Sequence, residues 1–344
     1  MTLRTYIIAR ILLTIPMIFI LLTMVFLIMR VLPGDPVLLH FEKNASPAAI
    51  EQMRHELGLD QPIWVQYFDY IWGLFHGDLG KSMIDYTPVS QQIFSAFPAT
   101  LELAIYSIAI AVLIGIFLGV EASRRYNTPE DHAIRVFGIV TYAIPVFFLG
   151  MVLQMIFGVW LRWLPVSGRI SPMMEPPAGL NIGNFHFSTG LYTIDSLLAG
   201  NIYQFVQAIT YLLLPSLTLG LVLCGVFVRI TRSNMFETLR LDFVTAARAR
   251  GLTENKVTYG YALRNAFLPI LTMVGLQFAT LLGGAVLTET TFSWPGLGRY
   301  IVYSIDSRDY TAIQGAVVVF GLFVSVVSLA VDVLYAYLDP RIRL

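Results

Sequence analysis

Six long stretches of the chain carry no charged side chain, and this spacing of charge constrains the fold more than any other feature of the sequence. The uncharged intervals are residues 11–29, 103–120, 136–161, 196–228, 265–288 and 310–331. Each is about 18 residues or longer, which is enough helix to cross a hydrocarbon core of roughly 30 Å. A charge at mid-membrane costs about 2.5–3.5 kcal/mol on insertion scales. Because 22 Lys and Arg and 22 Asp and Glu residues all avoid these intervals, we expect an all-α integral membrane protein with six transmembrane helices.

Composition and cysteine usage agree with this class of protein. Hydrophobic residues make up 56% of the chain and charged residues 13%, which excludes a soluble domain. The first interval is longer than the apolar region of a secretion signal and leads into Val31-Leu32-Pro33-Gly34-Asp35-Pro36, so we expect it to remain as the first span. The single cysteine, Cys224, lies inside the fourth interval, and an intrachain disulfide is excluded.

The distribution of basic residues predicts the orientation of the chain. If both termini are cytoplasmic, most of the 22 Lys and Arg residues fall on the cytoplasmic side, and most acids fall on the exterior side. Short basic loops resist translocation across a membrane, so this arrangement is the favoured one. We therefore expect a multi-pass membrane protein with both termini on the cytoplasmic side.

Two exterior segments are longer than a connection between spans requires. In 31–99, Ser46-Pro47 starts one helix, Pro62 starts another, and Thr87-Pro88 starts a third that continues into the second span. The second of these helices carries a stripe at three-and-four spacing, formed by Trp64, Tyr67, Phe68, Ile71, Trp72 and Phe75. Next to a span, such a stripe favours the lipid headgroup layer. The other segment, about 164–203, is rich in Pro, Gly and Ser and indicates an irregular loop or a small hairpin.

A basic segment, 231–266, separates the fourth and fifth intervals and is patterned like a folded part. It carries six of the 22 Lys and Arg residues against three acids. Asp242 can cap a short helix there, and Gly251 can end it in the left-handed conformation. Small residues on that helix allow close packing: they are Ala246, Ala247 and Ala249. From this pattern alone, a helix that inserts into a partner and a solvated loop that only fixes topology remain equally open.

Short motifs occur in a specific order along nearly the whole chain. They are LPGDP at 32–36, ELGLD at 56–60, HGDLG at 76–80, ATLEL at 99–103, PVSGR at 165–169, RITRS at 229–233, AARARG at 246–251, ALRNA at 262–266, TET at 288–290, FSWPGLG at 292–298 and DPRIR at 339–343. With these motifs the chain resembles the permease subunit of dipeptide and oligopeptide ABC importers, specifically the first of the two paired permeases. Its basic segment resembles the EAA loop of that family, except that Thr245 stands at the position of the name-giving glutamate.

The resemblance implies the type I importer permease fold, a location in the cytoplasmic (inner) membrane and a set of partners. The implied parts are a first span at 1–30, an exterior helical segment at 31–99 and a permease core at 100–344, with spans near 100–122, 136–161, 204–229, 267–288 and 312–336 and a cytoplasmic coupling loop at 231–266. The implied partners are a second permease subunit, two cytoplasmic ATPase subunits, an exterior solute-binding protein and lipid, without nucleic acid. In that family the loop helix docks into a cleft on the ATPase. The residues that this role would involve are Asp242, Thr245, Ala246, Ala247, Arg248, Arg250 and Gly251.

Motifs for catalysis or metal binding do not occur in the sequence. A Walker sequence is missing, and His55-Glu56 lacks the second histidine of a zinc protease because Leu59 stands in its place. Five histidines scattered through loops offer no ligand set. We therefore expect no enzyme activity, no metal and no cofactor on this chain, with ATP and Mg²⁺ used by the partner ATPases.

The sequence gives few constraints on which residues line a transport path. Polar residues in or near spans are the candidates for the path or its gate: they are Gln154, Gln277, Thr280 and Glu289. We give Asp332 a structural role, because near the cytoplasmic end of the last span it can snorkel or pair with Arg341 or Arg343. The expected cargo is di- or oligopeptides, and nickel, haem-like compounds or oligosaccharides remain alternatives. A secondary transporter is a further alternative, but such a protein is expected to carry charged residues at mid-membrane, which the spans lack.

Overall fold

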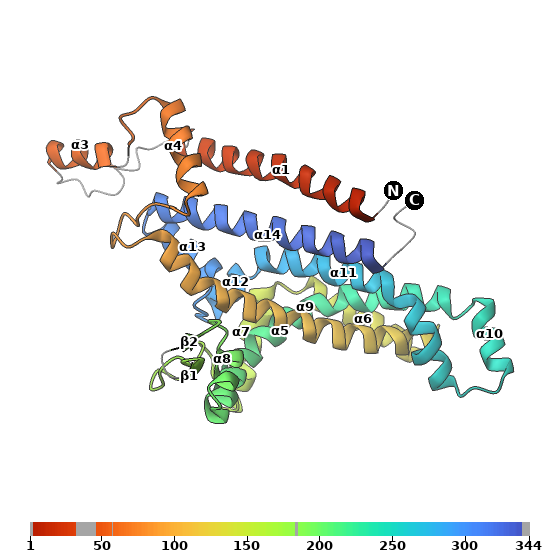
Figure 1. Ribbon diagram of the computed structural model, residues 1–344. Coiled ribbons are helices and arrows are strands. Elements are labelled where there is room, and N and C mark those ends of the chain that lie inside the picture. The colour runs from red at the N-terminus through yellow and green to blue at the C-terminus, as the bar shows by residue number, and fades with distance from the viewer. Residues whose placement is uncertain (1–2, 32–45, 57, 183–184, 339–344) are drawn as a thin grey trace.

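Long helices run side by side through most of the molecule (Figure 1). The computed structural model describes residues 3–31, 46–56, 58–182 and 185–338. Among these residues, five helices are long and apolar enough to cross a membrane: they are α1 (Leu3–Val31), α5 (Val89–Arg124), α9 (Ile202–Thr238), α11 (Leu263–Gly284) and α14 (Tyr310–Leu338). A π-helical segment, η2 (Lys256–Ala262), leads directly into α11.

The third of the expected spans is broken in the middle. Helix α6 (Pro129–Ala143) is followed by α7 (Val146–Leu153) and a π-helical continuation, η1 (Gln154–Trp160), and the two halves are bent by 103°. The break falls at Ile144, which has φ −73° and ψ 129°. A residue before proline is pushed out of the helical region, and Pro145 follows it. With the bent pair counted as one span, the six-span fold that the sequence predicts is confirmed.

The core of the bundle is formed where α5, α9 and α11 meet. Its buried side chains include Leu103, Phe227 and Ile270. Two glycines on α5 let α9 approach closely, because an added Cβ at Gly115 would lie 2.3 Å from the Cβ of Phe227 and one at Gly119 would lie 2.6 Å from the Cβ of Thr231. Close backbone approach through small residues is the usual means of packing helices in a membrane.

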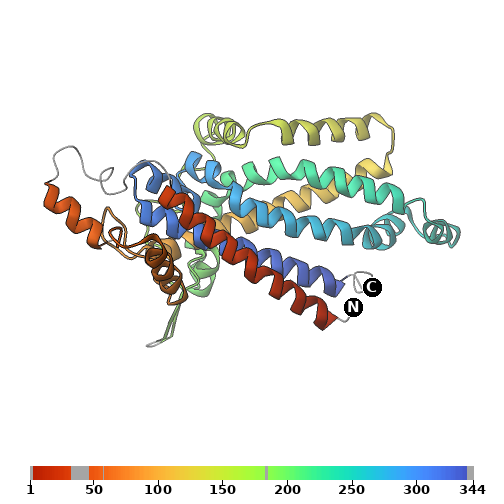
Figure 2. The same ribbon diagram turned by 90° about the horizontal axis from the view of Figure 1, so that it is seen from above.

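Helices α6 and α1 lie on opposite sides of this core (Figure 2). Helix α1 runs along α14, where Leu21 fills the space that a side chain at Gly321 would need. Near the other end of the same pair, Arg10 and Asp332 form an ion pair of 3.4 Å. Asp332 therefore has the structural role expected of it, but its partner is Arg10, and the expected partners Arg341 and Arg343 lie outside the described residues.

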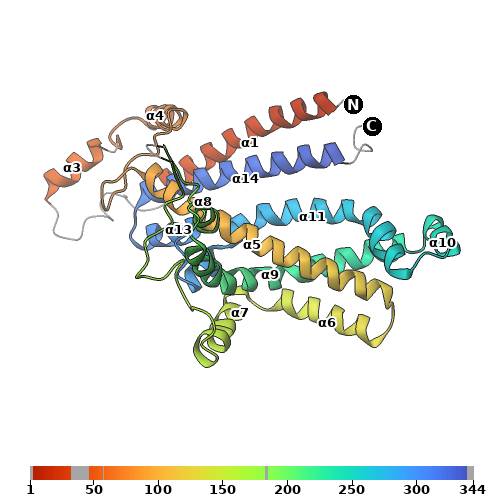
Figure 3. The same cartoon turned by 60° about the horizontal axis from the view of Figure 1, so that its bottom comes forward.

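The smaller elements gather at the two ends of the bundle (Figure 3). One end carries α3 (Pro47–Glu56), α4 (Ile63–Phe75), α8 (Tyr192–Leu198), α12 (Val286–Thr291), α13 (Leu297–Asp306) and a hairpin of β1 (Leu180–Ile182) and β2 (Phe185–Phe187). The strands pair antiparallel, with Leu180 opposite Phe187, so the segment 164–203 does contain a small hairpin. The other end carries α10 (Asp242–Ala249), together with the start of α1 and the end of α14.

Candidate functional site

Helix α10 projects from the bundle between α9 and η2. Its N-cap residue is Leu241, which makes no side-chain capping bond, so the expected cap by Asp242 is wrong. Asp242 occupies the first turn instead, where the positive end of the helix dipole stabilises its negative charge. Gly251 has φ +76°, so the turn after α10 is left-handed as the sequence predicts.

The residues of α10 divide into an inner and an outer face. Val244 and Ala247 are buried in a cluster with Val120, Met235 and Val257 of the same chain. The remaining residues singled out by the sequence are exposed: they are Asp242, Thr245, Ala246, Ala249, Arg248, Arg250 and Gly251. From the sequence, Ala246 and Ala247 were both expected to contact a partner, but only Ala246 lies on the surface.

An ion pair within the chain stiffens the turn that follows α10. Arg248 lies 2.6 Å from Glu254, and both side chains are about half exposed. The hydrogen bond from Arg248 holds the pKa of Glu254 below its usual range, and the same bond raises the pKa of Arg248. Arg124, at the end of α5, donates a hydrogen bond of 3.1 Å to Asn255. Arg248 was expected to reach a partner protein, whereas here it is paired with its own turn.

A second ion pair fixes α6 to α9 at the same end of the molecule. Arg232 donates from Nε and Nη2 to the two oxygens of Asp131, each over 2.7 Å. Asp131 is buried and also accepts from the backbone nitrogen of Asn127. Sequence reasoning did not find this pair, because its members lie 101 positions apart and nothing local marks them as partners.

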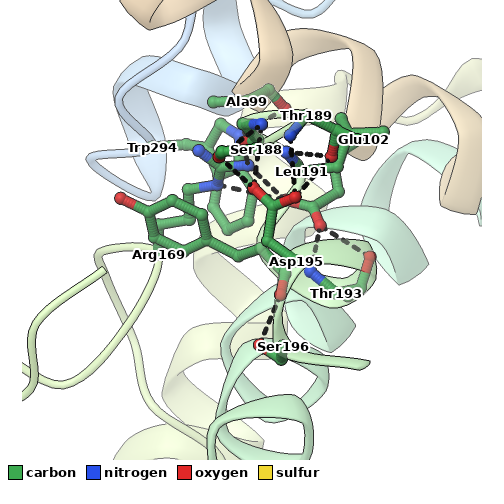
Figure 4. A network of polar contacts seen from close by, with 12 residues as sticks. Ala99, Glu102, Arg169, Ser188, Thr189, Leu191, Thr193, Asp195, Ser196 and Trp294 are labelled. Atoms are coloured by element: carbon green, nitrogen blue, oxygen red, sulfur yellow. Dashed lines mark hydrogen bonds and ion pairs between the residues drawn. The ribbon is translucent and has the colours of Figure 1, made fainter. Parts of the chain in front are cut away.

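The opposite end contains a buried polar network, shown in Figure 4, that joins α5 to the segment 164–203. Glu102 of α5 and Arg169 are both almost fully buried and lie 2.6 Å apart. Glu102 also accepts from the backbone nitrogen and the hydroxyl of Thr193, over 2.8 and 2.7 Å. Arg169 donates to the carbonyl of Gly190 and stacks 3.6 Å above the ring of Tyr192. The Glu102–Arg169 and Glu102–Thr193 contacts join the segment 164–203 to α5, whereas the contacts of Arg169 with Gly190 and Tyr192 lie within that segment.

Asp195 organises the loop between the hairpin and α8. Its carboxylate accepts from the Ser188 hydroxyl at 2.7 Å and from the backbone nitrogens of Thr189 and Gly190 at 2.8 Å each. A carboxylate that collects several donors from one short loop fixes the conformation of that loop. The loop after the hairpin is therefore an ordered part that lies against α5 (Figure 4).

Glu289 is buried beneath the turn between α12 and α13. Thr100 donates to one oxygen of Glu289 over 2.6 Å, and the backbone nitrogen of Arg299 donates to the other over 2.9 Å. Glycine is required above the carboxylate, because a Cβ at Gly296 would lie 2.3 Å from Oε1. Burial raises the pKa of Glu289 to about 7, against the opposing hydrogen bonds from Thr100 and Arg299. Glu289 thus caps the start of α13 and ties it to α5.

The four candidate path residues do not form one cluster. Gln154 donates from Nε2 to the carbonyl oxygens of Val166 and Thr291, over 2.7 and 3.1 Å. Gln277 and Thr280 form a separate pair on α11, with 3.1 Å between the Thr280 hydroxyl and the Gln277 amide oxygen. Within the described residues, no group of three or more His, Cys, Asp or Glu side chains is arranged to hold a metal ion.

These features define a polytopic membrane protein whose buried charges hold its helices and end segments together. The chain belongs to the family of binding-protein-dependent transport system inner membrane components. The profile of that family matches residues 111–344, and the profile of its N-terminal part matches residues 3–104.

Named relatives resemble the chain over nearly its whole length. It is 42% identical to the dipeptide transport system permease protein DppB of Escherichia coli K12 over 319 residues, which is 92% of each chain. It is 39% identical over 342 residues to the di/tripeptide transport system permease protein DppB of Pseudomonas aeruginosa UCBPP-PA14, covering 98% of each. The glutathione transport system permease protein GsiC of Salmonella typhi is 39% identical over 338 residues, also 98% of each.

Proposed function

We propose that this chain is a permease subunit of an ATP-driven importer that takes up di- or oligopeptides. The observation that carries the proposal is the 42% identity over 92% of the chain to a dipeptide permease. Its proposed partners are a second permease subunit, two cytoplasmic ATPase subunits that use ATP and Mg²⁺, and an exterior solute-binding protein. Both termini and α10 face the cytoplasm in this proposal.

Uptake by the reconstituted transporter tests this function. Proteoliposomes that contain both permeases and the ATPases, with the binding protein added outside, should accumulate labelled dipeptide only when ATP is inside. A proton or sodium gradient without ATP should give no uptake. Competition by unlabelled glutathione, nickel, haem and an oligosaccharide identifies the cargo class. Uptake driven by the gradient alone, or competition by a non-peptide cargo only, would overturn the proposal.

The exposed face of α10 is the surface through which the ATPase is proposed to act. Ala246 is a small exposed residue on a helix that is anchored from behind by Val244 and Ala247, and a rigid helix with a small outer residue fits closely into a groove. After Cys224→Ser, Ala246→Cys should form a crosslink to an ATPase subunit. Ala247→Cys is the matched control, since that position faces the chain itself. If position 246 forms crosslinks only to lipid or to the binding protein, the exposed face of α10 does not contact the ATPase.

The segments 31–99 and 164–203 are proposed to face the binding protein. Their length exceeds what a connection between two spans needs, and the Glu102–Arg169 pair holds the second segment rigidly on α5. A rigid platform is suited to receiving a docked protein, because little conformational entropy is lost on binding.

We propose that the path itself binds cargo weakly and that the binding protein selects it. The buried charges near the exterior end, Glu102, Arg169 and Glu289, already have partners within the chain. Free charges for a peptide's ammonium and carboxylate would be costly to keep in an apolar bundle. Calorimetry of peptides against the permease–ATPase complex alone should show no saturable binding at micromolar concentrations. Selective micromolar binding would redirect attention to Gln154, Gln277, Thr280 and Glu289 as path residues.

A further inference from the structure

Helix α4 is apolar on two faces, and within the described residues only one of them is used for packing. Its inner face contributes Ile71, which is buried with Leu22 and Val25 of α1 and Val318 of α14. Its other apolar face carries four large aromatic side chains at spacings of four, four and three residues. Trp64, Phe68, Trp72 and Phe75 are 63%, 65%, 69% and 76% exposed.

The inner face fixes how deep α4 lies relative to the membrane. The hydroxyl of Tyr67 lies 2.7 Å from that of Thr23. The ring of Phe26 lies 5.2 Å from the ring of Tyr67 and 5.5 Å from that of Tyr70. Thr23 and Phe26 precede Arg30, the charge that ends the first apolar interval, by about 10 and 6 Å of helix rise. Helix α4 therefore touches α1 below the end of its apolar stretch.

The direction of α4 fits a position at the membrane surface. Figures 1 and 3 show α4 at one end of α1, lying across the axis of that helix. A helix that crosses a span at this level lies roughly in the plane of the membrane. Amphipathic helices in this position bury their apolar side about 5–10 Å into the boundary between headgroups and acyl chains.

The surroundings of α4 favour lipid over water or a protein as the occupant of the aromatic face. The neighbouring surface of α1 is lipid-facing, with Ile20, Met24 and Ile28 exposed. An apolar groove of about 400 Å³ opens between α1 and α14 at the same end, and Met29 and Val317 are among its lining residues. Aromatic residues such as Trp are favoured at the headgroup level because their rings are apolar and carry a polar edge.

We propose that α4 is an interfacial helix whose Trp64, Phe68, Trp72 and Phe75 side chains lie among the phospholipids of the exterior leaflet. Asp69 is the single charged residue of α4, and it is exposed on a different side of the helix from the stripe. It points toward the headgroups and water. In this position α4 anchors the pair of α1 and α14 at the correct height. The proposal concerns the membrane contact of this chain and does not depend on its cargo.

Spin labels on α4 test the proposal in the assembled transporter. In a Cys224→Ser background, nitroxides are attached at Phe68→Cys and Trp72→Cys, with Asp69→Cys as the matched control on the same helix. The complex is placed in nanodiscs of phosphatidylethanolamine and phosphatidylglycerol. Labels at 68 and 72 should collide with oxygen more often, and with a water-soluble nickel chelate several-fold less often, than the label at 69. Equal access of the chelate to all three positions would place the stripe in water.

Two further outcomes would also overturn the proposal. Protection of positions 68 and 72 from both oxygen and the chelate would assign the stripe to a protein interface, with the second permease or the binding protein as the occupant.

A second measurement uses only conservative substitutions, so that it remains valid if a spin label disturbs folding. Brominated phospholipids should quench the fluorescence of the wild-type complex more than that of Trp64→Phe/Trp72→Phe. Equal quenching of the two proteins would remove these residues from the lipid boundary.

Discussion

Two adjacent alanines on α10 have opposite surroundings, although both are small residues of the same short helix. Ala247 is buried against side chains of α5, α9 and η2, whereas Ala246 points away from the chain. The same substitution should therefore act on folding at one position and on a partner contact at the other.

Ala247→Arg should destabilise the permease, since overpacking a buried site typically costs about 1–3 kcal/mol and an unpaired charge adds to this cost. Ala246→Arg should leave the melting temperature of the purified chain unchanged while it abolishes stimulation of ATP hydrolysis by the binding protein. Thermal unfolding and ATPase assays on both variants check this. Full stimulation in Ala246→Arg would mean that the outer face of α10 does not contact the ATPase.

The buried carboxyl of Glu289 predicts a pH dependence of stability. Its folded pKa is about 7, above the ordinary value of 4.5, so the folded state holds the proton more tightly than the unfolded state. Stability should fall as pH rises from about 4.5 to about 7 and should level off above that, by at most about 3 kcal/mol. Melting temperatures of the detergent-solubilised chain from pH 5 to 8 measure the trend. Glu289→Gln should flatten it, and an unchanged slope in this variant would assign the effect to other groups.

At the level of elements, the hairpin β1–β2 and the ordered loop behind it are separable. Residues 188–195 are fixed by Asp195 and by the Glu102–Arg169 pair, while the two strands are paired antiparallel with each other. The hairpin is therefore the part of the segment 164–203 that can be removed with least damage to the fold.

Deletion of residues 180–187 should lower uptake more than it lowers basal ATP hydrolysis, because the hairpin is proposed to act on the binding protein and not on the ATPase. Asp195→Ala is the comparison variant, since it should loosen the whole loop and increase its cleavage by added protease. Uptake equal to wild type after the deletion would reduce the hairpin to a passive connection.

The elements themselves could largely be predicted from the sequence, because their causes are local. Charge-free intervals mark the spans, and Ser46-Pro47, Pro62 and Gly251 mark helix ends. The sequence does not show that the helix breaks at Pro145, because four other prolines lie inside helices that stay continuous: Pro16, Pro98, Pro215 and Pro269. Packing decides whether a proline bends its helix. The ion pairs Glu102–Arg169 and Asp131–Arg232 join residues far apart in the chain and depend on the fold itself.

At the scale of the whole molecule, the two ends of the bundle should face opposite compartments. Helix α10, the start of α1 and the end of α14 lie at one end, and α3, α4 and the hairpin lie at the other (Figure 3). This arrangement agrees with the sidedness expected from the basic residues, and it leads to a direct test on intact cells.

A membrane-impermeant maleimide should label Glu51→Cys on α3 from outside the inner membrane and should label Ala246→Cys only after the membrane is opened, both in a Cys224→Ser background. The physical reason is that a charged reagent does not cross the hydrocarbon core. Labelling of position 246 in intact cells would reverse the orientation of the chain.

The break after α6 also bears on how this part of the molecule matches the thickness of the bilayer. A straight helix from Pro129 to Trp160 would be about 48 Å long, and its last half, Val146–Trp160, contains no charged residue. Straightened, the uncharged stretch 136–161 would be about 39 Å long, which is longer than the roughly 30 Å hydrocarbon core. With the 103° bend, its second half lies across the axis of α6, and the uncharged part of α6 itself, residues 136–143, rises only about 12 Å. The bend therefore exchanges a span that is too long for one that is too short along the axis of α6, and the bilayer or the neighbouring helices must take up the difference.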